Sequence, residues 1–142
     1  MLTGGYFYRS EFRPDQAFRI FNTWLGDPGK LVFLEKVIDV INKEGLLEKI
    51  TDTGEQLISD LTAAQNKYPQ YVENTRGRGT FVAIDFKNAA LRDQAIKELH
   101  LLGIHCGGSG DRSLRIRTTL TFSKKHVDIF IEKFNTMLSS WK

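Results

Sequence analysis

The sequence predicts an α+β fold, a two-layer sandwich in which a small, mainly antiparallel sheet has helices packed on one side. Three observations support this prediction: two amphipathic helical patterns fill residues 28–64, short strand patterns follow, and a strongly amphipathic helical pattern ends the chain. The 142 residues, 41% hydrophobic and 26% charged, suffice for one domain with a hydrophobic core.

Two consecutive helices are predicted first. Asp27 and Pro28 have the form of an N-cap and a first helical residue. The residues after them predict a helix with one buried face, formed by Leu31, Leu34, Val37, Ile38 and Ile41. A second amphipathic pattern runs from Leu46 to Ala64, and Pro69 stops it.

A strand and a third helix are predicted next. Residues 80–86 alternate in the manner of a strand that is covered on at least one face. Asn88 can cap the following helix, whose apolar residues end at Leu102. Gly103 stands where a left-handed residue closes a helix.

The last predicted elements are two short strands and a helix. Residues 104–106 predict a strand, and the glycine-rich segment 107–111 joins it to another strand at 114–117. Ser123 then caps an amphipathic helix that reaches the end of the chain.

Two arginines share one face of the strand at 114–117. Period-two alternation directs Leu114 and Ile116 to the core and Arg115 and Arg117 to the opposite face. An arginine there can pair with surface acids, or it can bind a carboxylate ligand with two parallel hydrogen bonds. The residues alone leave both roles open.

Composition argues against several other functions. The net charge of +3 comes from 20 basic residues spread among 17 acidic ones, which favours a mixed-charge surface over a nucleic-acid site. With a single cysteine, Cys106, and three scattered histidines, no metal site is expected. No apolar run approaches the roughly 20 residues of a membrane span, so no membrane partner is expected.

The first thirty residues are unusually aromatic and lack helical or strand periodicity. Exposed aromatic surface of this kind marks an interface, so the expected partner is more of the same protein, a second copy, or both. These thirty residues hold seven of the 16 aromatic residues, namely Tyr6, Phe7, Tyr8, Phe12, Phe18, Phe21 and Trp24.

The segment from Arg76 to Val82 invites comparison with a known RNA-binding signature. The match fails because Arg78 stands where a base-stacking aromatic is needed. The glycines of this segment then serve a tight bend. A freestanding α+β binding module, for example one that binds RNA, is the alternative function.

Five segments together carry a resemblance to a known family: residues 3–7, 12–14, 19–28, 76–81 and 114–117. They closely resemble the class III pyridoxal-phosphate aminotransferases, in the branch that acts on 4-aminobutyrate in animal mitochondria. The resemblance implies the C-terminal part of a longer enzyme. Residues 1–30 would be an arm from the cofactor domain and dimer interface, and residues 31–142 would be the small C-terminal domain.

For the cofactor, pyridoxal phosphate, the resemblance implies one residue within this chain. The hydroxyl of Thr23 would bind the cofactor phosphate of the neighbouring subunit. The Schiff-base lysine of the family would lie just before Met1, so this chain is expected to hold no catalytic residue and to be inactive alone. The electron sink comes from the cofactor, but the proton carrier comes from that lysine.

For the substrate, the resemblance implies that Arg115 binds a carboxylate or pairs with a glutamate outside this chain. Phe18 and Phe21 would line the pocket, and Gly108 and Gly110 would border it. Phe18 stands where the family more often has tyrosine, which removes a hydroxyl from the pocket wall.

The reaction implied for the complete enzyme moves the amino group of 4-aminobutyrate to 2-oxoglutarate, which gives succinate semialdehyde and glutamate. The partners would be the remainder of the same chain and a second subunit of a homodimer, without nucleic acid or membrane. By resemblance, the location would be the mitochondrial matrix.

Overall fold

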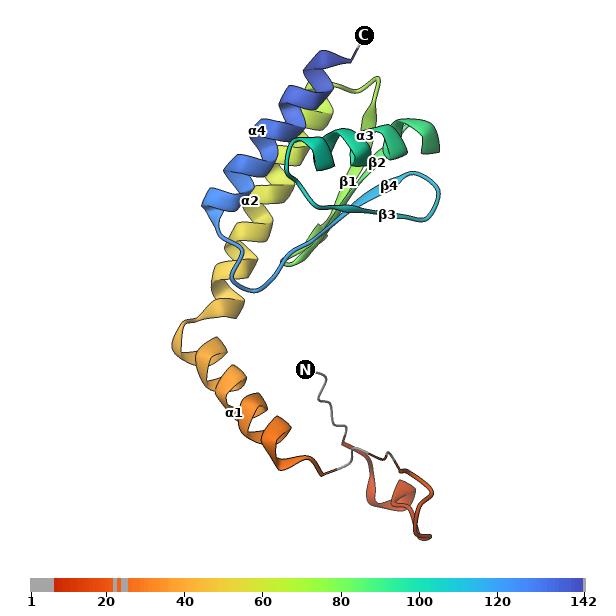
Figure 1. Cartoon of the computed structure of the whole chain (residues 1–142), viewed down its shortest axis with the longest axis vertical. Coiled ribbons are helices and arrows are strands. Elements are labelled where there is room, and N and C mark those ends of the chain that lie inside the picture. The colour runs from red at the N-terminus through yellow and green to blue at the C-terminus, as the bar shows by residue number, and fades with distance from the viewer. Residues whose placement is uncertain (1–6, 22, 24–25, 142) are drawn as a thin grey trace. The chain divides into compact units, whose positions relative to one another are not determined.

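The computed structural model describes residues 7–21, 23 and 26–141. Contacts divide the chain into two compact units, residues 1–44 and residues 45–142. The domain boundary after residue 30, which was predicted for the complete enzyme, stays a prediction. Figure 1 shows the elements of both units.

The N-terminal unit contains a short 3-10 turn, η1 (Ser10–Phe12), and helix α1 (Pro28–Lys43). The predicted cap is confirmed, because the Asp27 side chain accepts a hydrogen bond from the Lys30 backbone N–H at 3.3 Å. The predicted buried face of α1 is wrong for this chain, because no second layer packs on α1 among the described residues of its unit. Leu31, Val37 and Ile38 are each about half exposed.

The C-terminal unit has two layers. Helices α2 (Leu46–Lys67), α3 (Ala89–Leu101) and α4 (Lys124–Ser140) lie on one side of a four-stranded sheet (Figure 1). The strands lie in the order β1-β2-β4-β3, and all neighbours are antiparallel. The predicted α+β sandwich is therefore confirmed. The strands are β1 (Val72–Arg78), β2 (Phe81–Phe86), β3 (Gly107–Ser109) and β4 (Ser113–Arg117).

Two strands depart from the prediction. The sequence predicted one regular strand between α2 and α3, whereas the structure has the hairpin β1–β2. A bulge between Glu73 and Arg76, with Asn74 at φ +55°, hides β1 from a period-two pattern. The strand predicted at 104–106 is wrong, because backbone pairing with β4 places β3 at the glycines that follow.

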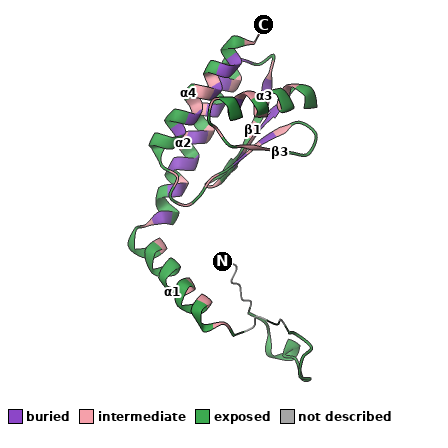
Figure 2. Ribbon diagram, viewed as in Figure 1, coloured by how far each residue is buried: buried purple, intermediate pink, exposed green. Residues whose placement is uncertain are grey.

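Alternate strand residues and the helices above them form the core of the C-terminal unit (Figure 2). Full burial of such a side chain stabilises the fold by about 1.5–3 kcal/mol. At the far end of this layer, the Trp141 indole N–H donates to Glu98 Oε2 at 2.7 Å and ties α4 to α3. The least exposed core residues include Leu57, Leu61, Val82, Ile84, Phe86, Leu99, Leu114, Val127 and Phe134.

The β1–β2 hairpin lies directly against α2. A Cβ atom added at Gly54 of α2 would lie 2.6 Å from the Cα atom of Gly79, which sits in the hairpin turn at φ +54°. Within the hairpin, a Cβ atom at Gly77 would meet the Phe81 carbonyl oxygen at 2.2 Å. Glycine is therefore required by close backbone approach at both positions. The predicted tight bend of this arginine- and glycine-rich segment is confirmed.

Candidate functional site

The side of the sheet that the helices leave uncovered carries the polar strand residues. We call it the open face. Its register puts Arg115 of β4 opposite Ala83 of β2 and Gly107 of β3. The predicted alternation is confirmed, because Leu114 and Ile116 are buried on the helix side. The open face consists of Glu73, Arg76, Arg78, Phe81, Ala83, Asp85, Gly107, Ser109, Ser113, Arg115 and Arg117.

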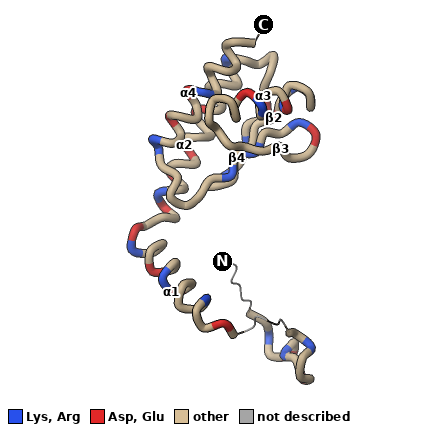
Figure 3. Tube along the Cα trace, in the orientation of Figure 1, with Lys and Arg blue, Asp and Glu red and all other residues tan. Residues whose placement is uncertain are grey.

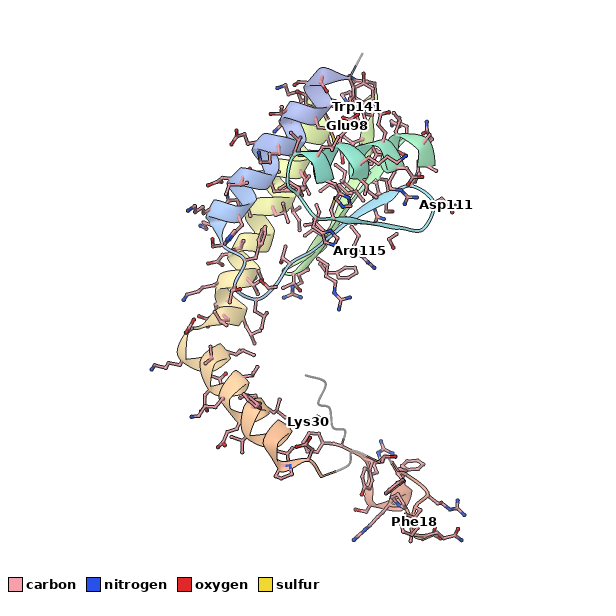
Figure 4. All side chains as sticks on the ribbon, in the orientation of Figure 1. Phe18, Lys30, Glu98, Asp111, Arg115 and Trp141 are labelled. Atoms are coloured by element: carbon pink, nitrogen blue, oxygen red, sulfur yellow. The ribbon has the colours of Figure 1, made fainter. Side chains whose placement is uncertain are left out.

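Arg115 is the candidate ligand-binding group of the open face. Its side chain is half-buried and borders an opening of about 150 Å³. No hydrogen bond, ion pair or ring contact engages its guanidinium among the residues that the structure describes, and Figure 4 shows the side chain on β4. By contrast, the Arg117 guanidinium lies 6.0 Å from the centre of the Phe81 ring. The opening is lined by Arg76, Gly77, Phe81, Ala83, Ser109, Ser113 and Arg115.

Next to this opening, Asp85 is buried in a polar network that the sequence did not reveal. Its Oδ1 atom accepts hydrogen bonds from Arg76 Nη1 at 2.8 Å and Ser113 Oγ at 2.6 Å, and its Oδ2 atom accepts one from Asn74 Nδ2 at 2.8 Å. Burial alone would raise the pKa of Asp85. The three hydrogen bonds and the charge of Arg76 outweigh burial and lower the pKa below its ordinary value.

The second acid of the open face, Glu73, is also paired. It accepts hydrogen bonds from Lys87 and, at 2.6 Å, from Arg112 Nη1. The Lys87 hydrogen bond is the main cause of the lowered pKa of Glu73. Figure 3 shows that Lys and Arg residues are interspersed with Asp and Glu residues along the described part of the chain.

The two glycines predicted to border the pocket lie in the β3–β4 hairpin. A Cβ atom at Gly108 would meet Arg92 Nη1 of α3 at 2.6 Å, so Gly108 faces the helix layer, whereas Gly107 shares the open face with Arg115. Gly110 is exposed at φ +54°, and its carbonyl oxygen accepts a hydrogen bond from Arg92 at 3.2 Å. Their role at the pocket stays a prediction.

The other predicted site residues belong to the N-terminal unit. The rings of Phe18 and Phe21 meet edge to face with centres 5.5 Å apart, and both are largely exposed. Phe18 has φ +64°, a strained value for a side chain of this size. Thr23 is exposed. The structure thus brings Phe18 and Phe21 together, and their roles, like that of Thr23, stay predictions.

Cys106 lies in a second, mostly apolar opening of about 330 Å³, beside the start of α4. Burial raises the pKa of its thiol to about 11, so it stays protonated at neutral pH and is a poor nucleophile. This agrees with a structural role for the cysteine.

None of the helices in the described part of the chain has the length and apolar composition that a membrane span requires.

The comparisons with known proteins place this α+β domain, with its helices on one side of the sheet, in an enzyme family. The family model described as Aminotransferase class-III matches residues 1–138, and the chain belongs to this family.

Individual relatives show which members of the family this chain is similar to. The chain is 43% identical over all of its 142 residues to the mitochondrial 4-aminobutyrate aminotransferase of Rattus norvegicus. It is 40% identical over its whole length to the 4-aminobutyrate aminotransferase of Dictyostelium discoideum. It covers only 28% and 29% of these two proteins. A lysine aminotransferase structure from M. tuberculosis matches with a TM-score of 0.69 and 29% identity, over 70% of this chain and 23% of that one.

Proposed function

We propose that this chain is the C-terminal part of a pyridoxal-phosphate transaminase that moves the amino group of 4-aminobutyrate to 2-oxoglutarate. The observation that carries the proposal is Arg115, a half-buried guanidinium without a partner among the described residues, beside an opening on the open face. Both substrates have a carboxylate, which arginine can bind through two parallel hydrogen bonds. The names of the animal relatives support the same reaction.

Pyridoxal phosphate, when bound, supplies the electron sink of transamination. Thr23 is exposed, so its hydroxyl is accessible to a phosphate oxygen and fits the proposed contact. The exposed rings of Phe18 and Phe21 fit the wall of a pocket that a second subunit completes.

The 142 residues alone are not expected to transaminate. A lysine that forms a Schiff base is activated by desolvation or by a neighbouring cation. Among the lysines that the structure describes, none is buried. The proposal therefore includes a catalytic lysine from outside this chain.

The proposed partners are the rest of the enzyme and a second subunit, and the proposed location is the mitochondrial matrix, as in the names of the animal relatives. Exposed large apolar residues throughout the described N-terminal unit support such an interface. Of the described strand residues on the open face, Phe81 is the one aromatic, and the Arg117 guanidinium lies over its ring. This offers little support for the RNA-binding alternative, which needs two or three stacking rings.

The first test uses the complete enzyme, meaning this chain together with its upstream sequence. Added pyridoxal phosphate should give a protein-bound visible absorption band, and 4-aminobutyrate should bleach it. The same spectrum of the 142 residues alone should show no such band. An extended protein without the band would contradict the proposed function.

The second test addresses Arg115. In the complete enzyme, Arg115→Ala should lower kcat/KM for 2-oxoglutarate by about 10- to 100-fold, the value of charge-assisted hydrogen bonds to a carboxylate. Arg117→Ala is the matched control on the same strand face, and it should change kcat/KM by less than about threefold, as expected for an exposed charge. Unchanged kinetics of Arg115→Ala would remove Arg115 from the site.

A further inference from the structure

Arg115 lies within reach of an acid of its own sheet but does not pair with it. Asp85 lies opposite Ser113, and Arg115 lies two residues further along β4, opposite Ala83. Diagonal neighbours on adjacent antiparallel strands have Cβ atoms roughly 7–8 Å apart or somewhat less, within reach of a long side chain. An Asp85 carboxylate without other partners would therefore pair with Arg115 and block it.

The structure shows what holds Asp85 away from Arg115. The Arg76 guanidinium donates from Nη1 to Asp85 Oδ1 at 2.8 Å and to the Asn74 carbonyl oxygen at 2.8 Å, and from Nη2 to Ser113 Oγ at 3.0 Å. The Asp85 side chain is 7% exposed, whereas that of Arg76 is 45% exposed. The carboxylate is thus held inside a network that leaves it little freedom to reach another cation.

The bulge in β1 makes this arrangement possible. The register shifts between Glu73 and Arg76, and Asn74 adopts φ +55°. Bulges of this kind redirect side chains. Here both Asn74 and Arg76 reach the single carboxylate on the neighbouring strand.

We propose that Arg76 is a positioning residue that keeps Arg115 free for the substrate carboxylate, by holding Asp85 in a network with Asn74 and Ser113. The inference rests on the proposed function, because it assumes that Arg115 binds that carboxylate. It adds a positioning role for Arg76 and Asp85, which act on carboxylate binding through Arg115.

The test compares variants of the complete enzyme. In Arg76→Gln, Asp85 loses its cationic partner and keeps the hydrogen bonds from Asn74 and Ser113, so it can pair with Arg115 as its new cation. KM for 2-oxoglutarate and Ki for glutarate, a plain dicarboxylate, should then both rise about 10-fold, while kcat stays within about threefold. Adding Asp85→Asn should then restore both constants to within about threefold of wild type, because an amide cannot form the competing ion pair. The melting temperature of the double variant should not return to the wild-type value, because the Arg76–Asp85 pair is still missing.

A matched control is Arg112→Gln, which removes one partner of Glu73. Glu73 lies on β1, opposite Asp85 and one strand further from Arg115, so KM and Ki should not change. If Arg76→Gln does not fold, Arg76→Lys keeps the charge but not the guanidinium's further bonds to the Asn74 carbonyl and Ser113, so KM and Ki should rise less and Asp85→Asn should again reverse the rise.

Two outcomes would overturn the proposal. One is an unchanged KM in Arg76→Gln. The other is a double variant with KM and Ki as high as those of the single variant, since a purely structural network gains nothing from Asp85→Asn. Failure of the proposed function is a separate result, because it would appear as unchanged KM and Ki in Arg115→Ala.

Discussion

The two units of this chain have similar apolar sequence patterns but differ in what the patterns bury. In residues 45–142, amphipathic helices cover one side of a sheet, and 19 apolar residues are buried. In the described part of residues 1–44 no residue is buried, although α1 has an amphipathic pattern of its own. An amphipathic pattern therefore predicts that a helix has a face to bury, but it does not identify what covers that face.

The largest expected effect comes from matched phenylalanine deletions in the two units. Phe134 is fully buried, and its ring centre lies 5.6 Å from that of Phe130. Phe134→Ala should cost about 3–5 kcal/mol of unfolding free energy through loss of apolar burial and creation of a cavity. Phe33 of α1 is 65% exposed, so Phe33→Ala should stay within about 0.5 kcal/mol.

Urea unfolding of the 142-residue chain, followed by far-UV circular dichroism, measures both changes. Equal losses in Phe134→Ala and Phe33→Ala would show that α1 packs into the same cooperative unit, and the contrast between the two units would be wrong.

Gly54→Ala should produce the next largest loss, again confined to the C-terminal unit. The added Cβ atom would lie 2.6 Å from the Gly79 Cα atom, and backbone cannot move aside as a flexible side chain can. Such overpacking costs about 1–3 kcal/mol. The control is Ser59→Ala at an exposed position of the same helix, where the alanine should be close to neutral. A Gly54→Ala chain as stable as wild type would contradict the close approach of α2 and the hairpin.

The fold could be predicted from the sequence where the signal is local. The Asp27 and Asn88 caps, the Gly103 helix end and the inward direction of Leu114 and Ile116 all follow from neighbouring residues, and all are confirmed. The position of β3 could not be predicted, because glycines have low strand propensity and only pairing with β4 makes them a strand.

The candidate site also has one part that the sequence predicts and one part that it does not. Arg115 could be singled out from strand alternation and resemblance. The network around Asp85 could not, because Asn74, Arg76 and Ser113 come from two other strands and meet only through sheet register and a bulge. No spacing rule along the sequence links residues that a sheet brings together across strands.

Lowering the pH should destabilise the C-terminal unit, because the Asp85 carboxylate then becomes protonated. Because its pKa is lower in the folded than in the unfolded chain, the carboxylate stabilises the fold at pH values above about 3.9, the unfolded value for aspartate. This contribution is lost as the pH falls through the lower folded pKa. In Asp85→Asn, the free energy of unfolding should therefore fall less steeply than in wild type as the pH drops below about 4.

The N-terminal unit supplies the control for this pH dependence. Asp39 of α1 pairs with Lys36 at 3.2 Å on an exposed surface, where an ion pair contributes about 0–1 kcal/mol. Asp39→Asn should leave the acid branch of the stability curve as in wild type. Urea midpoints measured from pH 3 to pH 7 in about one-unit steps would compare the two variants. An acid branch that Asp85→Asn leaves unchanged would contradict the lowered pKa.

The smallest expected effect distinguishes the two units by their helix caps. Asp27 caps α1 by accepting from the Lys30 N–H at 3.3 Å, and Asn88 caps α3 by accepting from the Leu91 N–H at 2.9 Å. Loss of an N-cap side chain costs about 1 kcal/mol of helix stability.

Because α3 is packed on the sheet and α4, Asn88→Ala should lower the unfolding free energy of the C-terminal unit by this amount. Asp27→Ala should only increase the amide hydrogen exchange rate in the first turn of α1, because the described N-terminal unit has no core to transmit the loss. Equal changes in the urea midpoint for both variants would mean that α1 and the sandwich unfold together.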